Sequence, residues 1–503
     1  MKESRYKNNL FAKKFNNQIE CEPMNNQSDT SIRDISWWKP VLFAAMAGGM
    51  GWGIRGQYGH ETGAMIAGVL VSLTLVFLLC PKASLLNTAR AVAWGTVAMG
   101  FGGSMTYGQT VGLTHNADMV NNWEALRWGL LGLSIKGGLW IGFAGLFLGI
   151  GLGGIRYRCR ELLLVMCGIV GMYFLGVYLL NSPFDRSNQM LPAIYFSASW
   201  YWQPGEVIKP RPECWGGLLL ALLALMAYVR LMRKDILANR LALWGFLGGA
   251  IGFPLGQCIQ AFHAWNPALF IEGFGLQLQD LINWWNMMET TFGAVMGASL
   301  GLGLWLNRKR IKITAIPDAV SMPLPIEGIL LIIHIGLLIA VEFMSFSIVD
   351  RVYDIGLIMG VIPVLAIAGA RWWPYLVIFP ITLLPICGKT VKQLVYQEAA
   401  ITPVAGWWVY LIIPLLISTA IAIWFGSQTM KKQTGYNLTR FGLLLSTWTY
   451  FMLNFAFFRF PWPWDTWTSR TPNGIIFTIC ALGLTAAVMF GGNKEPNSIP
   501  SPE

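Results

Sequence analysis

The feature that most constrains this fold is a long succession of apolar stretches, many close to the roughly 20 residues that a helix needs to cross a bilayer. The 503-residue chain is 55% hydrophobic and 12% charged, with a mean hydropathy of +0.51, so it has too few charges to cover a soluble surface. The apolar runs are continuous rather than alternating, and backbone groups in hydrocarbon must be bonded within the segment. We therefore predict an all-α polytopic integral membrane protein.

The apolar runs divide into about fourteen predicted transmembrane helices. The predicted spans are 39–56, 63–80, 90–108, 127–153, 161–180, 215–231, 241–263, 287–307, 325–347, 355–370, 373–388, 403–425, 440–458 and 473–491.

Lysine and arginine gather in alternate short loops, and such loops are retained on the cytoplasmic side of a membrane. The residues on this predicted face are Lys82, Arg90, Arg156, Arg158, Arg160, Arg230, Arg233, Lys234, Arg240, Arg308, Lys309, Arg310, Lys312, Lys431, Lys432 and Arg440. This bias predicts that both termini are cytoplasmic, in a membrane such as the bacterial inner membrane. The net charge of +11 mostly reflects these loops. Because no basic stretch is interleaved with aromatic residues, we predict no nucleic-acid partner.

Charge and hydropathy also suggest how the chain is organised. Residues 1–38 are polar and contain no apolar segment of the kind found in signal peptides, so we predict a disordered cytoplasmic tail. Residues 39–310 form a half with about eight spans, and residues 311–492 form a half with about six. Residues 493–503 are a second predicted cytoplasmic tail.

One sequence pattern occurs twice at identical spacing, which indicates an internal repeat. The first copy is Asn121, Glu124, Gly132, Ser134, Gly138, Leu139 and Trp140, and the second is Asn286, Glu289, Gly297, Ser299, Gly303, Leu304 and Trp305. Upstream, Gly108-Gln109 precedes His115 just as Gly256-Gln257 precedes His263. Spans three and four thus match spans seven and eight in the same orientation, a parallel repeat of the kind known among transporters. A fainter third version contains Gly56-Gln57 and His60-Glu61.

The repeated polar residues are predicted to lie at the non-cytoplasmic ends of their helices and to converge on one outward-facing pocket. They are Gln57, His60, Glu61, Gln109, His115, Asn121, Glu124, Gln257, His263, Asn286 and Glu289. Carboxylates, amides and imidazoles among tryptophans suit a polyhydroxylated or amino-sugar-like solute, or a proton-coupled carrier. An alternative for each glutamate is a purely structural one, since an acidic residue stabilises the N-terminus of the helix that it opens.

Two cations accompany this set. Arg55 ends the first predicted span beside the pocket, and Lys136 lies within the fourth, where the second copy of the repeat has Gly301. Either cation is a candidate contact for a carboxylate or a phosphate. Instead of binding a solute, Lys136 could have a purely structural role. It would then either form an ion pair with a buried glutamate or extend its side chain toward the membrane surface.

The candidates for proton or cation coupling are Glu124, Glu289 and Glu342, because ionisable residues near or within the membrane are costly unless they have a role. Glu342 lies in span nine, eight residues after His334. A metal would need ligands at helical spacing, and the sequence has neither H-x-x-x-H nor H-E-x-x-H. We therefore predict no metal site and no cofactor.

Glycine is frequent, at 55 residues, and runs such as 47–53 and 149–154 are rich in it. Small residues at helical spacing favour close packing of transmembrane helices, and unwound helices that expose backbone to a solute are the alternative.

These features predict a secondary transporter that moves a small polar or acidic organic solute, such as a carbohydrate, as a proton- or cation-coupled symporter. The alternative is a membrane-embedded transferase that acts at the outer face on a lipid-linked sugar or acyl donor. The depth of the polar residues in the membrane distinguishes the transporter from the transferase. A carrier needs Lys136 and Glu342 to line a central cavity, whereas an enzyme would have apolar packing in its cytoplasmic half.

Overall fold

A computed structural model describes residues 35–59, 61–102, 108–181, 215–344, 346–354, 357–429, 433–458 and 467–490. All regular elements in these ranges are helices, and the one strand-like pairing is an isolated bridge between Ser84 and Thr434. The all-α prediction is confirmed for this part of the chain. The predicted tails fall almost entirely outside the described residues, as does His60.

The helices of the first half are α2 (Trp38–Arg55), α3 (Ala64–Leu79), α4 (Leu85–Gly102), α5 (Gly108–His115), α6 (Trp123–Leu152), α7 (Cys159–Gly176), α8 (Trp215–Ala227), α9 (Ile236–Trp265), α10 (Gly273–Leu281) and α11 (Trp284–Leu306). The helices of the second half are α12 (Leu324–Phe343), α13 (Ser347–Asp354), α14 (Leu357–Gly369), α15 (Trp373–Leu376), α16 (Thr382–Val391), α17 (Pro403–Trp407), α18 (Ile413–Gln428), α19 (Tyr436–Phe457) and α20 (Thr471–Phe490). Single π-helical turns extend or join several of them, including 377–381, 392–397 and 408–412.

Each predicted span overlaps at least one of the helices given above. Eight helical segments in the described part are long and apolar enough to cross a membrane, so the count of fourteen spans stays a prediction. They are Trp123–Leu152, Cys159–Leu180, Trp215–Met232, Ile236–Trp265, Leu324–Phe343, Trp373–Gln397, Pro403–Gln428 and Thr471–Phe490. The protein is thus a helical membrane protein by length and composition. Two further apolar helices are shorter, Ala64–Leu79 and Gly360–Gly369.

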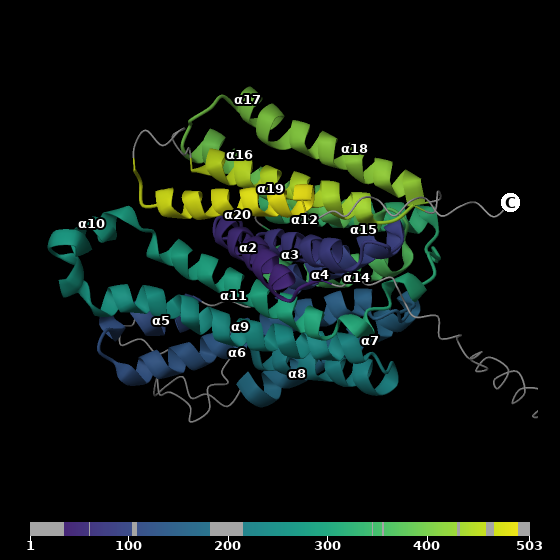
Figure 1. The fold of residues 1–503 in the computed structure, drawn as a ribbon, viewed down its shortest axis with the longest axis horizontal. Coiled ribbons are helices and arrows are strands. Elements are labelled where there is room, and N and C mark those ends of the chain that lie inside the picture. Colours follow the sequence, from purple (N-terminus) through teal and green to yellow (C-terminus); the bar gives the residue numbers. More distant parts are fainter. Residues whose placement is uncertain are drawn as a thin grey trace, which may run out of the picture.

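Six helices of the first half form a closed ring, in which α2, α3, α4, α6, α9 and α11 each contact the next and α11 returns to α2. Figure 1 labels all of these helices. Glycine makes two of these contacts unusually close. A Cβ atom on Gly48 of α2 would collide with the carbonyl oxygen of Gly293 in α11, and one on Gly249 of α9 would collide with that of Gly137 in α6. The glycine-rich segments therefore act as packing surfaces at these positions.

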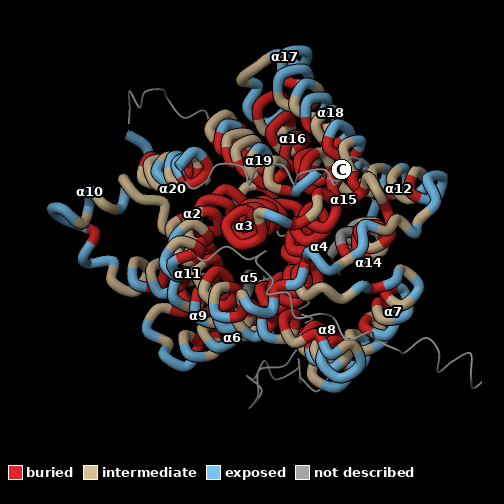
Figure 2. Tube along the Cα trace, turned by 45° about the vertical axis from the view of Figure 1, so that its right-hand side comes forward, coloured by how far each residue is buried: buried red, intermediate tan, exposed pale blue. Residues whose placement is uncertain are grey.

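Helices α3 and α4 are buried along their whole lengths, as Figure 2 shows at the centre of the molecule. Their burial follows from the second half of the chain, since α19 packs on α3, α14 on α4 and α20 on α2. A helix that is apolar all round, as α3 is, belongs in such an interior. By contrast, α7, α12 and α18 lie at the periphery and expose many apolar side chains.

The basic loops meet at one end of the bundle, here called the basic end. The Lys312 amide donates to the Leu152 carbonyl at 2.9 Å, and Arg233 donates to the Arg156 carbonyl at 2.7 Å. At the opposite end, here called the far end, α2 and α9 finish while α6 and α11 begin. The polar residues of the repeat lie toward the far end.

Candidate functional site

Aromatic side chains fill the interior of the ring midway along its helices. Trp52 of α2 contacts Trp140 of α6 edge to face at 4.8 Å between centroids and Phe292 of α11 at 4.5 Å. Phe292 in turn stacks on Phe253 of α9 at 4.8 Å. Because α2 and α6 are not neighbours in the ring, the Trp52–Trp140 contact spans its interior. We call these four residues the aromatic plug.

Arg55 lies directly on the far side of this plug. It follows Trp52 by one helical turn and places its guanidinium over the rings of Trp52 and Trp140, at 5.0 and 5.5 Å. Its Nη2 atom is 3.6 Å from Oε1 of Glu289 in α11, and the side chains are only 2% and 1% exposed. A buried ion pair of this kind is stable only when further polar groups accompany it.

Those further groups come from the start of α11 and the end of α2. Asn286 donates its Nδ2 hydrogens to the Gly53 carbonyl at 2.7 Å and to Glu289 at 3.1 Å. The Trp285 indole also donates to Glu289, at 3.3 Å. Gly56 leaves room for the carboxylate, since a Cβ atom there would collide with it. The short helix-ending sequence from Gly53 to Gly56 thus encloses Glu289 closely.

A second polar group lies between α5, α6 and α9. Lys136 is one turn from Trp140 toward the far end, is buried, and donates to the Thr110 hydroxyl. Gln257 is one turn beyond Phe253 and donates to the Thr114 hydroxyl at 2.7 Å. Helix α5 therefore provides a threonine hydroxyl to each of these two side chains.

The two histidines lie farther out and contact the indoles at the start of α11. His115 ends α5, with its Nδ1 atom 2.8 Å from the Val111 carbonyl and its ring 5.9 Å from that of Trp285. Burial lowers the pKa of His115, which favours the neutral ring. His263 stacks on Trp284 at 4.6 Å.

The duplicated motif does not occupy equivalent positions. Asn121 and Glu124 are exposed, Asn121 with a positive φ of 70° and Glu124 in the first turn of α6. Asn286 and Glu289 are buried, and α11 already begins at Trp284, so Glu289 does not open its helix as expected. The structure therefore brings only the second copy to Arg55.

The third version of the motif lies in the turn between α2 and α3. Gln57 is partly buried and Glu61 is buried at 6% exposure. His60 and the side chain of Gln109 lie outside the described residues. We call the five buried residues Arg55, Glu289, Asn286, Lys136 and Gln257 the ring site.

Glu342, the third candidate for proton or cation coupling, lies in the second half of the chain. It ends α12 and pairs with Lys389 of α16 and with Lys392 at 3.3 Å. A pocket of about 530 Å³ adjoins Glu342, Lys392 and Trp407. The lysines were missed because they follow an apolar run by only a few residues and resembled ordinary boundary charges.

Arg470 was also missed, because it precedes α20 in a loop with no helical pattern. Its guanidinium lies 3.7 Å from the centre of the Phe458 ring. Burial lowers its pKa, and the charge of Glu289 opposes that effect, so Arg470 lies within electrostatic range of the ring site.

Fold and site together define an all-α membrane protein with a buried arginine–glutamate pair inside a ring of helices. No family model, no curated protein and no solved structure matches the chain. Among the residues that the structure describes, no group of three or more histidine, cysteine, aspartate or glutamate side chains is arranged to hold a metal ion.

Proposed function

We propose that this protein is a secondary transporter of a small organic anion, such as a sugar acid or a sugar phosphate, and that transport is coupled to protons. The observation that carries the proposal is the Arg55–Glu289 pair, buried at 2% and 1% exposure inside the ring. An arginine is the usual partner for carboxylate and phosphate groups, because its fork of donors matches their oxygens.

In this proposal Glu289 and the solute compete for Arg55. When Glu289 is ionised it occupies the guanidinium, and when it takes up a proton its attraction for Arg55 falls. The solute carboxylate or phosphate then replaces it on Arg55. One proton on Glu289 and one anion on Arg55 cross together, so the buried site carries little additional charge in either state, as a low-dielectric interior requires.

The neighbouring groups suit a hydroxylated anion. Lys136 and Gln257 lie on the same side of the aromatic plug as Arg55, and both are bonded to threonine hydroxyls of α5. Hydroxyl groups on a solute are chemically equivalent replacements for these threonines. Trp52 and Trp140 offer apolar ring faces on the basic-end side of Lys136 and Gln257.

The plug and α5 are the proposed gates. The plug closes the ring toward the basic end, while α5 covers Lys136 and Gln257 at the far end. Alternating access would require the two barriers to open in turn.

The second candidate is a membrane-embedded transferase that acts on a lipid-linked donor at the far end. Two observations favour it. The aromatic plug lies on the basic-end side of Arg55, as expected for a site that opens on one side only. In addition, apolar pockets lie between α16, α18 and α19, where a lipid chain would fit.

Uptake into proteoliposomes tests the proposal. Labelled sugar acids, sugar phosphates and neutral sugars would be offered under an imposed proton gradient. We expect accumulation of an acidic solute by the wild type, loss in Arg55→Gln and Glu289→Gln, and normal uptake in Glu272→Gln, whose carboxylate is exposed. No uptake by the wild type, together with loss of transfer to a lipid-linked substrate in membranes carrying the Arg55 and Glu289 variants, would favour the transferase.

A further inference from the structure

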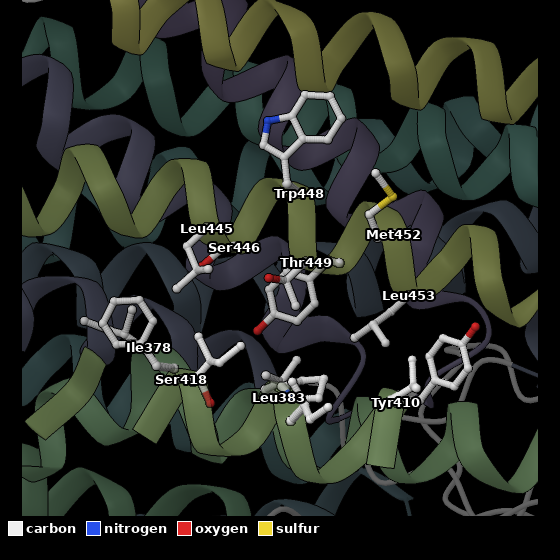
Figure 3. A pocket seen from close by; sticks show the side chains of 16 residues that line it. Ile378, Leu383, Tyr410, Ser418, Leu445, Ser446, Trp448, Thr449, Met452 and Leu453 are labelled. Atoms are coloured by element: carbon white, nitrogen blue, oxygen red, sulfur yellow. The ribbon is translucent and has the colours of Figure 1, made fainter. Parts of the chain in front are cut away.

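An apolar groove runs along the outside of the second half. One part, of about 450 Å³, lies between α16, α18 and α19 (Figure 3). A second part, of about 670 Å³, adjoins it toward the far end and is bounded by α19, α20 and the segment that follows α16. Tyr410, Trp448 and Met452 line both parts, so the two are continuous.

The groove suits an apolar occupant. Its lining is mainly leucine, isoleucine, methionine and aromatic side chains. Two of its polar groups are already bonded within the protein, since the Ser418 hydroxyl donates to the Leu415 carbonyl at 3.1 Å and the Trp448 indole donates to Thr485 at 3.1 Å. A polar ligand would gain few hydrogen bonds there.

The groove also faces the surroundings of a membrane protein rather than its core. Ile413, Ile417 and Met452 are 45%, 51% and 58% exposed, although all three line the groove. In a helical membrane protein such a surface meets lipid, and a concave strip of it accommodates a single acyl chain.

Arg470 is the cation that we consider for a lipid headgroup. Phe455 lines the far-end part of the groove, and Phe458 follows it by three residues, about 4.5 Å along α19. Arg470 rests on the Phe458 ring at 3.7 Å. A guanidinium, the group that best matches a phosphate, therefore packs on a residue about one helical turn beyond the lining of the strip.

We propose that this groove binds one phospholipid, with an acyl chain between α18 and α19 and the headgroup phosphate on Arg470. The proposal does not depend on transport and stands on the groove and Arg470 alone.

Native mass spectrometry of the detergent-purified, delipidated full chain tests the proposal. The probes are phosphatidylglycerol and diacylglycerol with the same acyl chains, which differ in the phosphate. We expect one phosphatidylglycerol to bind the wild type, and diacylglycerol to bind about tenfold more weakly, the loss that corresponds to one charge-assisted hydrogen bond.

Two variants separate the parts of the site. Met452→Trp fills the groove and should weaken both lipids about tenfold, as the loss of part of a buried chain predicts. Its matched control is Met489→Trp, at 57% exposure on α20 and outside the groove lining, which should bind like the wild type. Arg470→Gln should lower phosphatidylglycerol binding to the diacylglycerol level and leave diacylglycerol unchanged.

Thermal unfolding in the same detergent establishes that each variant is folded before binding is compared. Equal lipid binding by Met452→Trp and Met489→Trp would overturn the groove as the site. Equal binding of the two lipids by the wild type would overturn Arg470 as the phosphate contact. Neither result depends on whether the protein transports a solute, so a failed uptake experiment and a failed lipid experiment remain distinguishable.

Discussion

Arg55 at the end of α2 and Glu289 in the second turn of α11 form an ion pair, with Nη2 and Oε1 3.6 Å apart and both side chains almost fully buried. The residues are far apart in the chain, yet Gly53, Gly56 and Asn286 bring their backbones together around the carboxylate. Arg55 also rests on two indole rings, so the pair joins the polar far end of the ring to its aromatic plug.

Breaking this pair should have unequal effects on stability. Glu289→Leu leaves a buried arginine that cannot lose its charge, and we expect a loss of about 3–5 kcal/mol in the free energy of unfolding. Arg55→Met should cost less, because a carboxyl can become neutral by taking up a proton. Chemical unfolding in detergent measures both, and the double variant Arg55→Met/Glu289→Leu should be more stable than the sum of the single losses predicts. Strict additivity would argue against the pairing.

The two glutamates of the repeat should differ in transport. If Glu289 takes up the coupled proton, Glu289→Gln should abolish proton-driven accumulation and preserve exchange of solute across the membrane, because Arg55 remains available. Glu124 is exposed at the start of α6. Glu124→Gln should therefore change neither accumulation nor exchange by more than about twofold, because an exposed charge contributes little. Accumulation and exchange assays in the same proteoliposomes make the comparison. A similar loss in both variants would restore the symmetric role that the repeat suggests.

Close glycine contacts should be sensitive to a single methyl group. Gly249→Ala places a Cβ atom against the Gly137 carbonyl oxygen, so we expect a loss of about 1–3 kcal/mol from overpacking. Gly336 in α12 has open space around its Cβ position, and Gly336→Ala should stabilise the helix by about 0.5–1 kcal/mol. Unfolding in one detergent allows direct comparison. Equal effects would mean that α6 and α9 are not in close contact.

The stability of the protein should fall in mild acid, in part through His115. Burial lowers the pKa of this histidine below its usual 6.5, so the unfolded chain binds its proton first as the pH falls. The contribution of His115 to the free energy of unfolding is fully present above pH 6.5 and is lost as the pH falls toward the pKa of His115 in the folded protein. Tm values measured between pH 7.5 and about 5 should fall less for His115→Gln than for the wild type. An identical decrease would show that the ring stays exposed to solvent.

From the sequence alone, the membrane class, the helical fold and the approximate place of the longer helices could be predicted. These follow from local quantities, namely the length of the apolar runs and the charges between them. The sequence also identified Arg55, Lys136, Asn286, Gln257 and Glu289 as unusual, because polar residues at the ends of apolar helices are costly without partners.

Which of these residues contact one another is seen only in the folded protein. Hydropathy does not specify how a helix is rotated, so the repeat implied equal roles for Glu124 and Glu289, whereas packing exposes one and buries the other. It likewise did not specify the partners of Lys136 and Glu342, which include a threonine of α5 for Lys136 and two lysines for Glu342. The groove and Arg470 left no periodic signal, because they arise from α16, α18, α19 and α20 coming together. Contacts between distant segments depend on helix rotation and packing, and these are properties of the assembled ring.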